Sequence, residues 1–381
     1  MKGTIRLKGI TWGHSRGYTP LVACAQRYEE LHPEVSITWQ KRTLQEFADF
    51  PIERLVHDYD LLIIDHPWAG CAAATQCVLP LDEHLPAAYL AEQRQHTTGA
   101  SHESYYYGGH QWALAIDAAT PVASYRQDLL AEPPADWEAL LQLAEKGKVA
   151  VPAIPIDLLM NFYMFCIALG NTPFTSEEEV IDNTTGAAAL NMMAALWGRV
   201  NPQLFNCNPV AVAELMTATD DYWYCPFAYG YSNYARRGYA RHRLQYADLV
   251  TVNGKKLCST LGGTGLAVSA FSAHPQQAVQ FAQWAVSPQV QASIYVEHGG
   301  QPGHRLAWED EEANRRTNGY FRNTLPALQR AFVRPRYNGY LHFQDHAGNP
   351  LHHYLQYGGH EATVLNEMNS LYRQSRKLLH A

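Results

Sequence analysis

The sequence has few features that would connect it with membranes or nucleic acids. No apolar run approaches the roughly 20 residues of a membrane-spanning helix, and only 17% of the residues are charged. The formal net charge is −7, and the basic residues are scattered apart from short groups such as Arg236-Arg237 and Arg315-Arg316. Proteins that bind nucleic acids usually concentrate Lys and Arg on one face. These absences argue against membrane insertion and against a nucleic-acid partner.

Export and disulfide signals are also missing. The opening residues MKGTIRLKGITWG lead directly into an expected strand, without the apolar segment of a secretory signal. The seven cysteines are odd in number, and none form a C-x-x-C pair, which argues against a zinc ribbon and for reduced, mostly buried thiols. The sequence as written therefore predicts a soluble cytoplasmic protein. The alternative is a periplasmic protein whose signal sequence was removed.

Aromatic residues are abundant instead. The chain has 23 Tyr, 9 Trp and 12 Phe, together with 18 His. Tyr and Trp combine a flat apolar face with one polar group, which suits both core packing and a pocket that stacks on a ring and hydrogen-bonds its edge. Most of these side chains are expected in the core, and a minority remain candidates for contact with a ligand.

The order of patterns predicts an α/β protein with two lobes, because 381 residues exceed one ordinary core. After the first strand, Thr19 as N-cap and Pro20 at the first helical position predict a helix over 19–32. The alternation in 35–39 and the apolar run in 59–65 predict strands, the second of them buried in a parallel sheet. Ligands of such sheets bind beyond the carboxyl ends of the strands.

Patterns farther along predict a second lobe starting near residue 118. A strand is expected to end at Asp117, a short buried strand to cover 149–154, and a nearly all-round apolar helix to follow it. The aromatic stretch 220–239 is expected to form a loop wall. The segment 334–350 is expected as a loop, and the last helix runs over 359–379.

Several stretches resemble a known family across most of the chain. These are YEELHPEVSITW, YDLLIID, VLPLDEHLP, YYYGGHQWALAIDAATPVASYRQDLL, PADWEALLQLA, LGGTGLAVS and PQQAVQFAQWAVSPQVQASI. Their order is similar to that of the family 1 solute-binding proteins of ABC importers, whose carbohydrate-binding members have the type II periplasmic-binding fold. The spacing from YGG through a strand and an Asp to YRQDLL is the most specific part of the resemblance.

The resemblance implies two α/β lobes, each a mainly parallel sheet flanked by helices, that close on a ligand in the cleft between them. Lobe one would comprise 1–116 and 246–325, and lobe two 117–245 and 326–381. The implied function is to clamp a small polar molecule, expected to be a sugar or a sugar-like compound, as in ABC transport. The expected partners are that ligand and an ABC permease, and the protein is expected to be a monomer without a cofactor.

Gly13-His14-Ser15-Arg16-Gly17 matches the G-x-S-x-G pattern of a hydrolase nucleophile elbow. Only fourteen residues precede Ser15, which leaves no room for the upstream oxyanion loop of that fold. The expected helix also starts after Ser15, whereas the elbow needs a helix that starts at the serine. We therefore interpret the stretch as a ligand-holding turn and not as a nucleophile site.

The candidate ligand-binding residues lie at strand ends and in aromatic stretches. Asp65 and Asp117 would accept hydrogen bonds from vicinal hydroxyls, although each could equally cap a turn. Arg336 would bind a ligand carboxylate or form an ion pair. The full set is Trp12, His14, Arg16, Asp65, His66, Trp68, Asp117, Trp223, Tyr229, Tyr231, Asn233 and Arg336.

Metal and catalytic sites have weaker support. His342, Asp345 and His346 could gather with His352 and His353 around a metal, but the spacing lacks the Glu neighbour of a zinc motif, so no metal is expected. No catalytic residue is assigned. The alternative function is a cytoplasmic enzyme or sensor on the same scaffold, with acid–base chemistry by His14, Asp65, His66 and Asp117. Bound ligand recovered unchanged would favour the binding protein, and altered ligand the enzyme.

Overall fold

The computed structural model describes residues 4–43, 46–47 and 50–377 of the chain. The chain divides into two compact units. Unit 1 comprises 1–119, 262–315 and 336–338, and unit 2 comprises 120–261, 316–335 and 339–381. The expected lobes had been placed at 1–116 with 246–325 and at 117–245 with 326–381. Each unit is described by itself below.

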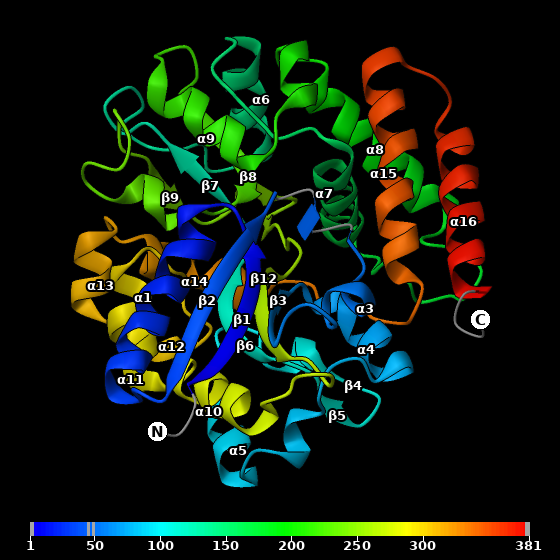
Figure 1. Cartoon of the computed structure of the whole chain (residues 1–381). Coiled ribbons are helices and arrows are strands. Elements are labelled where there is room, and N and C mark those ends of the chain that lie inside the picture. Colours follow the sequence, from blue (N-terminus) through cyan, green and yellow to red (C-terminus); the bar gives the residue numbers. More distant parts are fainter. Residues whose placement is uncertain (1–3, 44–45, 48–49, 378–381) are drawn as a thin grey trace. The chain divides into compact units, whose positions relative to one another are not determined.

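Unit 1 is built on a five-stranded sheet with the strand order β2-β1-β3-β12-β6 (Figure 1). The β1 strand pairs in parallel with β2 and β3, whereas β12 is antiparallel to both β3 and β6. Four of the five strands therefore run in one direction, as expected for this lobe. The strands are β1 (Ile5–Trp12), β2 (Val35–Arg42), β3 (Leu61–Ile64), β6 (Leu114–Ala119) and β12 (Gly262–Val268).

Helices cover this sheet and supply much of its core. The apolar side of α1, including Leu21, Ala25 and Tyr28, is buried in one cluster with residues of α10. The described helices of unit 1 are α1 (Ser15–Leu31), α3 (Ile52–Leu55), α4 (Ala69–Thr75), α5 (Ala87–Gln95), α10 (Pro275–Ala285), α11 (Pro288–Val290) and α12 (Arg305–Glu309). A π-helix, η6 (Gln291–Tyr295), follows α11, and α13 (Glu311–Arg316) ends at the unit boundary. The small hairpin β4 (Tyr106–Tyr107) and β5 (His110–Gln111) lies between α5 and β6.

The start of α1 differs from the sequence-based expectation. The helix begins at Ser15 and not at Thr19, and Pro20 lies inside it. His14 is the N-cap, because its Nδ1 accepts a hydrogen bond of 3.0 Å from the Arg16 N–H. Histidine is a less common N-cap than threonine, so the Thr19-Pro20 signal was the stronger one in the sequence. One of the two arguments against a nucleophile elbow at Ser15 is thereby removed.

Unit 2 has fewer strands and more helix. Its sheet has the order β8-β7-β9 and is antiparallel throughout, so the expectation of a mainly parallel sheet is wrong for this unit. An apolar run in the sequence does not reveal whether a strand is parallel or antiparallel to its neighbours, because the direction depends on how the strands are connected. The strands are β7 (Pro121–Tyr125), β8 (Tyr224–Tyr229) and β9 (Gln245–Ala247), with a hairpin of β10 (Thr251–Val252) and β11 (Lys255–Lys256).

In unit 2, α7 packs against α8 and α15, and its sides are nearly all buried, as its apolar sequence predicts. Gly348 of α15 meets the first turn of α7 so closely that a Cβ atom there would lie 2.1 Å from the Pro155 carbonyl oxygen. The helices are α6 (Trp137–Glu145), α7 (Pro155–Ala168), α8 (Asn183–Trp197), α9 (Pro209–Ala218), α14 (Tyr320–Gln329), α15 (Tyr340–Tyr357) and α16 (Glu361–Lys377). Figure 1 shows α15 and α16 side by side.

Three other expectations are corrected in and around unit 2. Residues 149–154 form one isolated bridge, Val149 to Tyr224, and no strand. Half of the stretch 220–239 lies in β8 and the short helix η5 (Ser232–Ala235), and Tyr224, Tyr231 and Tyr234 are buried, so the stretch is not a loop wall. The expected loop 334–350 is helical from Tyr340 onward, because α15 packs against α7 and α16; the left-handed Gly339 precedes its first turn.

Candidate functional site

One edge of the unit 1 sheet gathers most of the predicted site residues. β1 and β3 both end there, followed by His14 and by Asp65. Asp117, which was expected at the end of β6, lies inside that strand and pairs with Thr264 of β12. The next residue of β12, Gly265, is paired with Ile64 of β3. The register therefore aligns Asp117, Thr264 and Asp65 along this edge, which we call the unit 1 edge.

A buried ion pair connects α1 with β6 at the unit 1 edge. The Arg16 Nε donates to Asp117 Oδ2 at 3.1 Å, and Arg16 Nη2 donates to Asp117 Oδ1. The Gln301 N–H also donates to Asp117 Oδ2, at 3.3 Å. Burial raises the pKa of Asp117 because it disfavours the charged carboxylate, and the neighbouring Arg16 opposes this effect. Bidentate pairing fixes both side chains in one geometry.

His14 is held neutral beside this pair. Burial, and then the charge of Arg16, lower the pKa of His14 to about 4. A neutral ring fits its position, since Nδ1 must carry a lone pair to accept the Arg16 N–H. His14 thus acts as a helix cap and orients the residue that bonds to Asp117.

The turn after β3 places Asp65, His66 and Trp68 at the same edge. The Asp65 carboxylate accepts a hydrogen bond of 2.8 Å from the His66 N–H and caps the short helix η1 (His66–Trp68). The His66 Nδ1 lies 3.3 Å from Asp65 Oδ1, and the ring is buried. Asp65 combines the two roles that the sequence left open, because it caps a turn and also lies among the candidate ligand groups.

Two indole rings at this edge have different surroundings. A Cβ atom on Gly17 would lie 2.3 Å from the Trp12 ring, and Phe47 packs on that ring at 5.4 Å between centroids. Trp12 is therefore part of the core that supports α1. Trp68 lies in η1 outside that cluster. Among the residues that the structure describes, neither indole Nε1 has a hydrogen-bond acceptor.

Thr264 is a residue that the sequence analysis missed. Its hydroxyl is buried between Asp117 and Asp65 in register and has no hydrogen-bond partner in the described part of the chain. The stretch LGGTGLAVS contributed to the family resemblance, but no candidate site residue was taken from it. A buried, unsatisfied hydroxyl at a strand edge is a group that a polar ligand can complete.

In unit 2, three predicted residues lie together where β8 ends. The Tyr229 hydroxyl is 2.9 Å from Thr260 Oγ1, and the Tyr231 carbonyl accepts a hydrogen bond of 3.0 Å from Tyr246. Asn233 lies in η5 and is 3% exposed, with no donor to its Oδ1 among the described residues. We call this group the unit 2 edge.

Asp157 is a second residue that the sequence analysis missed. It lies in the first turn of α7, is 7% exposed, and its Oδ2 has no hydrogen-bond partner within the described ranges. Burial raises the pKa of Asp157 to about 8, so the carboxyl is mostly protonated at neutral pH. The segment before α7 runs parallel to β8 at the Val149–Tyr224 bridge, so α7 starts toward the unit 2 edge.

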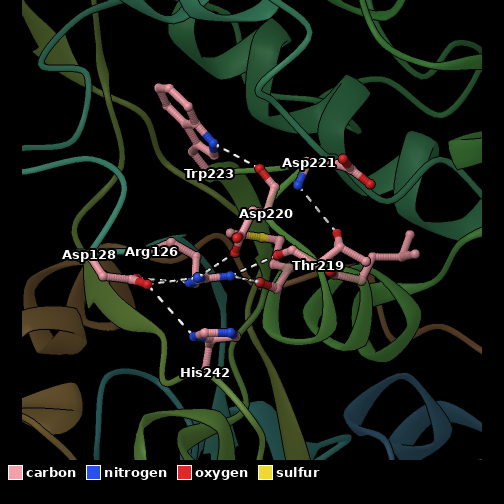
Figure 2. A network of polar contacts seen from close by, with 9 residues as sticks. Arg126, Asp128, Thr219, Asp220, Asp221, Trp223 and His242 are labelled. Carbon is pink, nitrogen blue, oxygen red and sulfur yellow. Dashed lines mark hydrogen bonds and ion pairs between the residues drawn. The ribbon is translucent and has the colours of Figure 1, made fainter.

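Trp223 does not join Tyr229, Tyr231 and Asn233. Trp223 precedes β8, whereas Tyr229 is the last residue of this strand and the other two follow it. The whole strand, roughly 20 Å long, therefore lies between Trp223 and these three residues. Its Nε1 donates to the Asp220 carbonyl at 3.0 Å, and the Lys148 ammonium lies over its ring at 4.9 Å. Figure 2 shows Trp223 next to the network around Arg126.

That network uses all the donor directions of Arg126. Its guanidinium binds both carboxylate oxygens of Asp128, one of Asp220, and the carbonyls of Met216 and Thr219, at 2.7–2.9 Å (Figure 2). Arg126 is 1% exposed, whereas both carboxylates reach solvent. The network joins the end of β7 to the end of α9 and thereby supports the start of β8.

Arg336 also has partners within its own unit. Its Nη1 donates to the carbonyls of Glu103, Ser104 and Tyr106 at 2.8–3.1 Å, and its guanidinium lies 5.7 Å from the Tyr107 ring centroid. These bonds tie residues 336–338 to the hairpin. The geometry favours a structural role over either a ligand contact or an ion pair.

Metal and membrane signals are absent from the described residues. Across 4–43, 46–47 and 50–377, no three His, Cys, Asp or Glu side chains are grouped to hold a metal ion. The rings of His342 and His346, both in α15, lie 4.5 Å apart between centroids and are tilted by 38°, and His346 Nδ1 bonds to the His342 carbonyl. No helix in this part of the chain has the length and hydropathy to cross a membrane.

Two α/β units with polar residues at the carboxyl ends of their strands are typical of binding proteins for small solutes. The comparison with known families agrees with this class: the model of the bacterial extracellular solute-binding proteins matches residues 32–303. The chain belongs to that family, which confirms the resemblance stated from the sequence.

One curated relative matches a shorter part of this chain than the family model does. The maltotriose-binding protein of Pyrococcus abyssi is 28% identical over 122 residues, which are 32% of this chain and 26% of that protein. The chain thus matches about a quarter of this curated relative's length. The match adds to the family assignment, but it covers too little of the relative to transfer its ligand.

Solved structures share the fold over nearly the whole chain. The maltose-bound MalE3 of T. maritima has a TM-score of 0.85 at 15% identity, covering 97% of this chain and all of that one. A solute-binding protein of Agrobacterium radiobacter K84 in complex with ribitol has a TM-score of 0.80 at 16% identity and 98% coverage of both chains. The maltotriose-bound Thermus thermophilus protein has 0.77 at 18% identity, covering 98% and 100%. The α/β fold with two lobes is confirmed by these likenesses.

Proposed function

We propose that this protein binds a small sugar or sugar alcohol as the solute-binding component of an ABC importer. The observation that carries the proposal is the unit 1 edge, where an ion pair, a carboxylate, an unsatisfied hydroxyl and an indole lie at the ends of adjacent strands. Such a mixture of polar groups and a flat apolar ring matches a sugar, which has hydroxyls at its rim and an apolar face.

Each proposed contact has a chemical reason. The carboxylates of Asp65 and Asp117 accept hydrogen bonds from vicinal hydroxyls, and Asp117 has lone pairs beyond those used by Arg16. Thr264 adds a hydroxyl that can donate or accept. Trp68 supplies a stacking face. His14, His66 and Trp12 act by holding these groups in place.

The unit 2 edge supplies a second set of proposed ligand contacts. Tyr229 and Tyr231 offer rings, and Asn233 offers an amide whose Oδ1 accepts a sugar hydroxyl. Asp157, which is mostly protonated at neutral pH, can donate a hydrogen bond as well as accept one. We propose that each set contributes contacts to the ligand, and that Trp223 and Arg336 do not touch it.

The family and its neighbours support the choice of ligand and compartment. The neighbours described above were solved with maltose, ribitol and maltotriose, and another, from Thermotoga lettingae, with α-D-tagatose. The family is described as extracellular, which favours export and an ABC permease as partner. These properties are proposals for the present chain.

A thermal-shift screen tests the proposal. The protein is heated with maltose, maltotriose, ribitol and tagatose, and a sugar at 100 times its Kd raises the free energy of unfolding by about 2.7 kcal/mol. We expect at least one of them to raise Tm by several degrees. A screen in which none raises Tm would remove the sugar assignment.

Two tryptophan variants make the test specific to the site. Trp68→Ala should weaken sugar binding about tenfold or more, because it removes a stacking face. Trp223→Ala is the matched control, and binding should be unchanged. Equal losses in both variants, or a loss only in Trp223→Ala, would contradict the proposed site.

A further inference from the structure

A short basic segment follows the unit 2 edge along the chain. Residues 236–243 have the sequence RRGYARHR, with four Arg, one His and no acidic residue. This is the densest group of basic residues in the sequence, in a chain whose formal net charge is −7. We call residues 236–243 the basic loop. A local excess of positive charge on a negative protein is typical of a surface that meets an anionic partner.

Three arginines of the basic loop reach solvent. Arg237, Arg241 and Arg243 are exposed. Within residues 4–43, 46–47 and 50–377, no hydrogen bond or ion pair joins the side chain of any of the three to another residue. Their charges are therefore available to groups outside the chain.

The carboxylates around the basic loop are already engaged. Those of the Arg126 network are bound by that guanidinium, and His242 of the loop lies 3.7 Å from Asp128 in the network (Figure 2). The Glu214 carboxylate accepts a hydrogen bond of 2.7 Å from the Tyr234 hydroxyl. These contacts leave the three exposed arginines without an acidic partner in the described part of the chain.

The basic loop is held in a defined shape. The Leu244 N–H donates to the Tyr234 carbonyl at 2.9 Å, which ties the residue after the loop to the helix η5 before it. Gly238 has a φ of +80° and turns the chain. The next residue, Tyr239, packs edge-on against Tyr234 at 5.1 Å between ring centroids and keeps 39% of its surface exposed. The turn therefore presents a fixed aromatic ring among the exposed arginines.

This combination fits the surface of an anionic bilayer. Guanidinium groups match phosphate oxygens in geometry and charge. Tyrosine is enriched at the level of lipid headgroups, because its ring is apolar and its hydroxyl is polar. An acidic protein segment would satisfy the arginines but would not by itself require an exposed ring beside them. The loop thus favours a lipid surface over an acidic protein.

We propose that the basic loop binds the headgroups of anionic phospholipids at a membrane surface. Arg237, Arg241 and Arg243 contact the phosphates, and Tyr239 lies among the headgroups. Each arginine close to such a surface strengthens binding about fivefold, so the binding is weak and reversible. This interaction goes beyond the proposed sugar binding and does not depend on it.

Vesicle co-sedimentation tests the proposal with the full-length protein. We expect binding to vesicles of equal parts phosphatidylglycerol and phosphatidylcholine, and little binding to phosphatidylcholine alone. Raising the salt from about 0.1 M to about 1 M shortens the Debye length from about 10 Å to about 3 Å and should weaken binding about tenfold or more. Equal binding to both kinds of vesicle, or none to the anionic ones, would overturn the proposal. Binding to polyglutamate but not to the vesicles would overturn it in favour of an acidic protein partner.

Two triple variants assign the binding to the basic loop. The loop variant carries Arg237→Gln, Arg241→Gln and Arg243→Gln. It should bind the anionic vesicles about 100-fold more weakly. The control variant replaces by Gln three arginines that each pair with a glutamate elsewhere, Arg27, Arg199 and Arg315.

Both triple variants change the net charge equally, so only a role of the loop separates them. The control variant should bind like the wild type. Equal losses in the two variants would show that net charge alone governs binding, and the proposal would be wrong. The comparison of vesicles with the wild-type protein holds even if a variant fails to fold.

Discussion

Residues 14–17 combine a helix start, a buried charge and a close ring contact within one turn of the chain. His14 caps α1 with its ring nitrogen, Arg16 reaches the Asp117 carboxylate, and Gly17 lets the Trp12 ring approach the helix. Ser15 therefore matches the G-x-S-x-G pattern in sequence, but its neighbours form a helix start and an ion pair and not the surroundings of a hydrolase nucleophile. The stretch works as a support for Arg16, whose pairing with Asp117 defines the unit 1 edge.

The His14 cap should be sensitive to acid. Its pKa is about 4 in the folded protein and about 6.5 in an unfolded chain. Between these values the unfolded state binds more protons, so this group's stabilising effect is complete above pH 6.5 and is lost as pH falls to 4. Asn also caps helices but does not titrate, so His14→Asn should lose less stability than the wild type between pH 7 and 4.5.

Urea unfolding at the two pH values measures this difference. His14→Ala is the comparison, and it should cost about 1 kcal/mol at pH 7 through loss of the cap. An equal acid loss in the wild type and in His14→Asn would show that His14 does not carry the effect.

The Arg16–Asp117 pair should behave as a coupled unit. Asp117→Ala leaves the Arg16 charge buried without its carboxylate and should cost about 3–5 kcal/mol. The double variant Arg16→Ala/Asp117→Ala should cost less than the sum of the two single variants, by about 1–3 kcal/mol. Chemical unfolding followed by circular dichroism measures all four proteins. Additive losses would contradict the direct pairing.

At the scale of elements, β8 separates two groups of residues that are close in sequence. Tyr229, Tyr231 and Asn233 lie at its carboxyl end, whereas Trp223 lies before its start. The Arg126 network fixes that start by binding β7 and α9 together (Figure 2). An aromatic stretch that looks uniform in sequence thus divides into a candidate site and a structural support.

Replacing Arg126 by Lys tests the network. Lys keeps the positive charge but cannot form the planar fork that binds two carboxylates and two carbonyls. We expect a loss of roughly 2 kcal/mol or more, because buried carbonyls lose their donor. Arg199→Lys is the matched control: Arg199 pairs with Glu145 at an exposed site, and its replacement should change stability by less than about 0.5 kcal/mol. Equal effects would show that the network adds nothing beyond a surface ion pair.

At the scale of the molecule, periodicity predicted part of the fold correctly. The strands β2 and β3 and the buried helix α7 follow directly from their apolar patterns. The antiparallel sheet of unit 2 and the helical course of 340–350 could not be predicted, because they depend on contacts between distant segments.

The same reason limits the prediction of the site. Asp65 and His66 could be inferred from their place after a buried strand, because the carboxyl ends of parallel strands share one edge. Thr264 and Asp157 could not, because their significance comes from buried oxygen atoms without partners, which only the folded chain reveals. The register of β12 against β3 and β6 is what aligns Thr264 with the two aspartates.

Isothermal titration calorimetry tests the central claim most directly, when the sugar is recovered afterwards for mass spectrometry. Titration of maltose, maltotriose, ribitol and tagatose should give saturable binding for at least one of them, with a negative heat-capacity change from burial of the ligand's apolar face. The recovered sugar should have an unchanged mass. No heat of binding from any of the four, or conversion of the bound sugar into a product, would contradict the account.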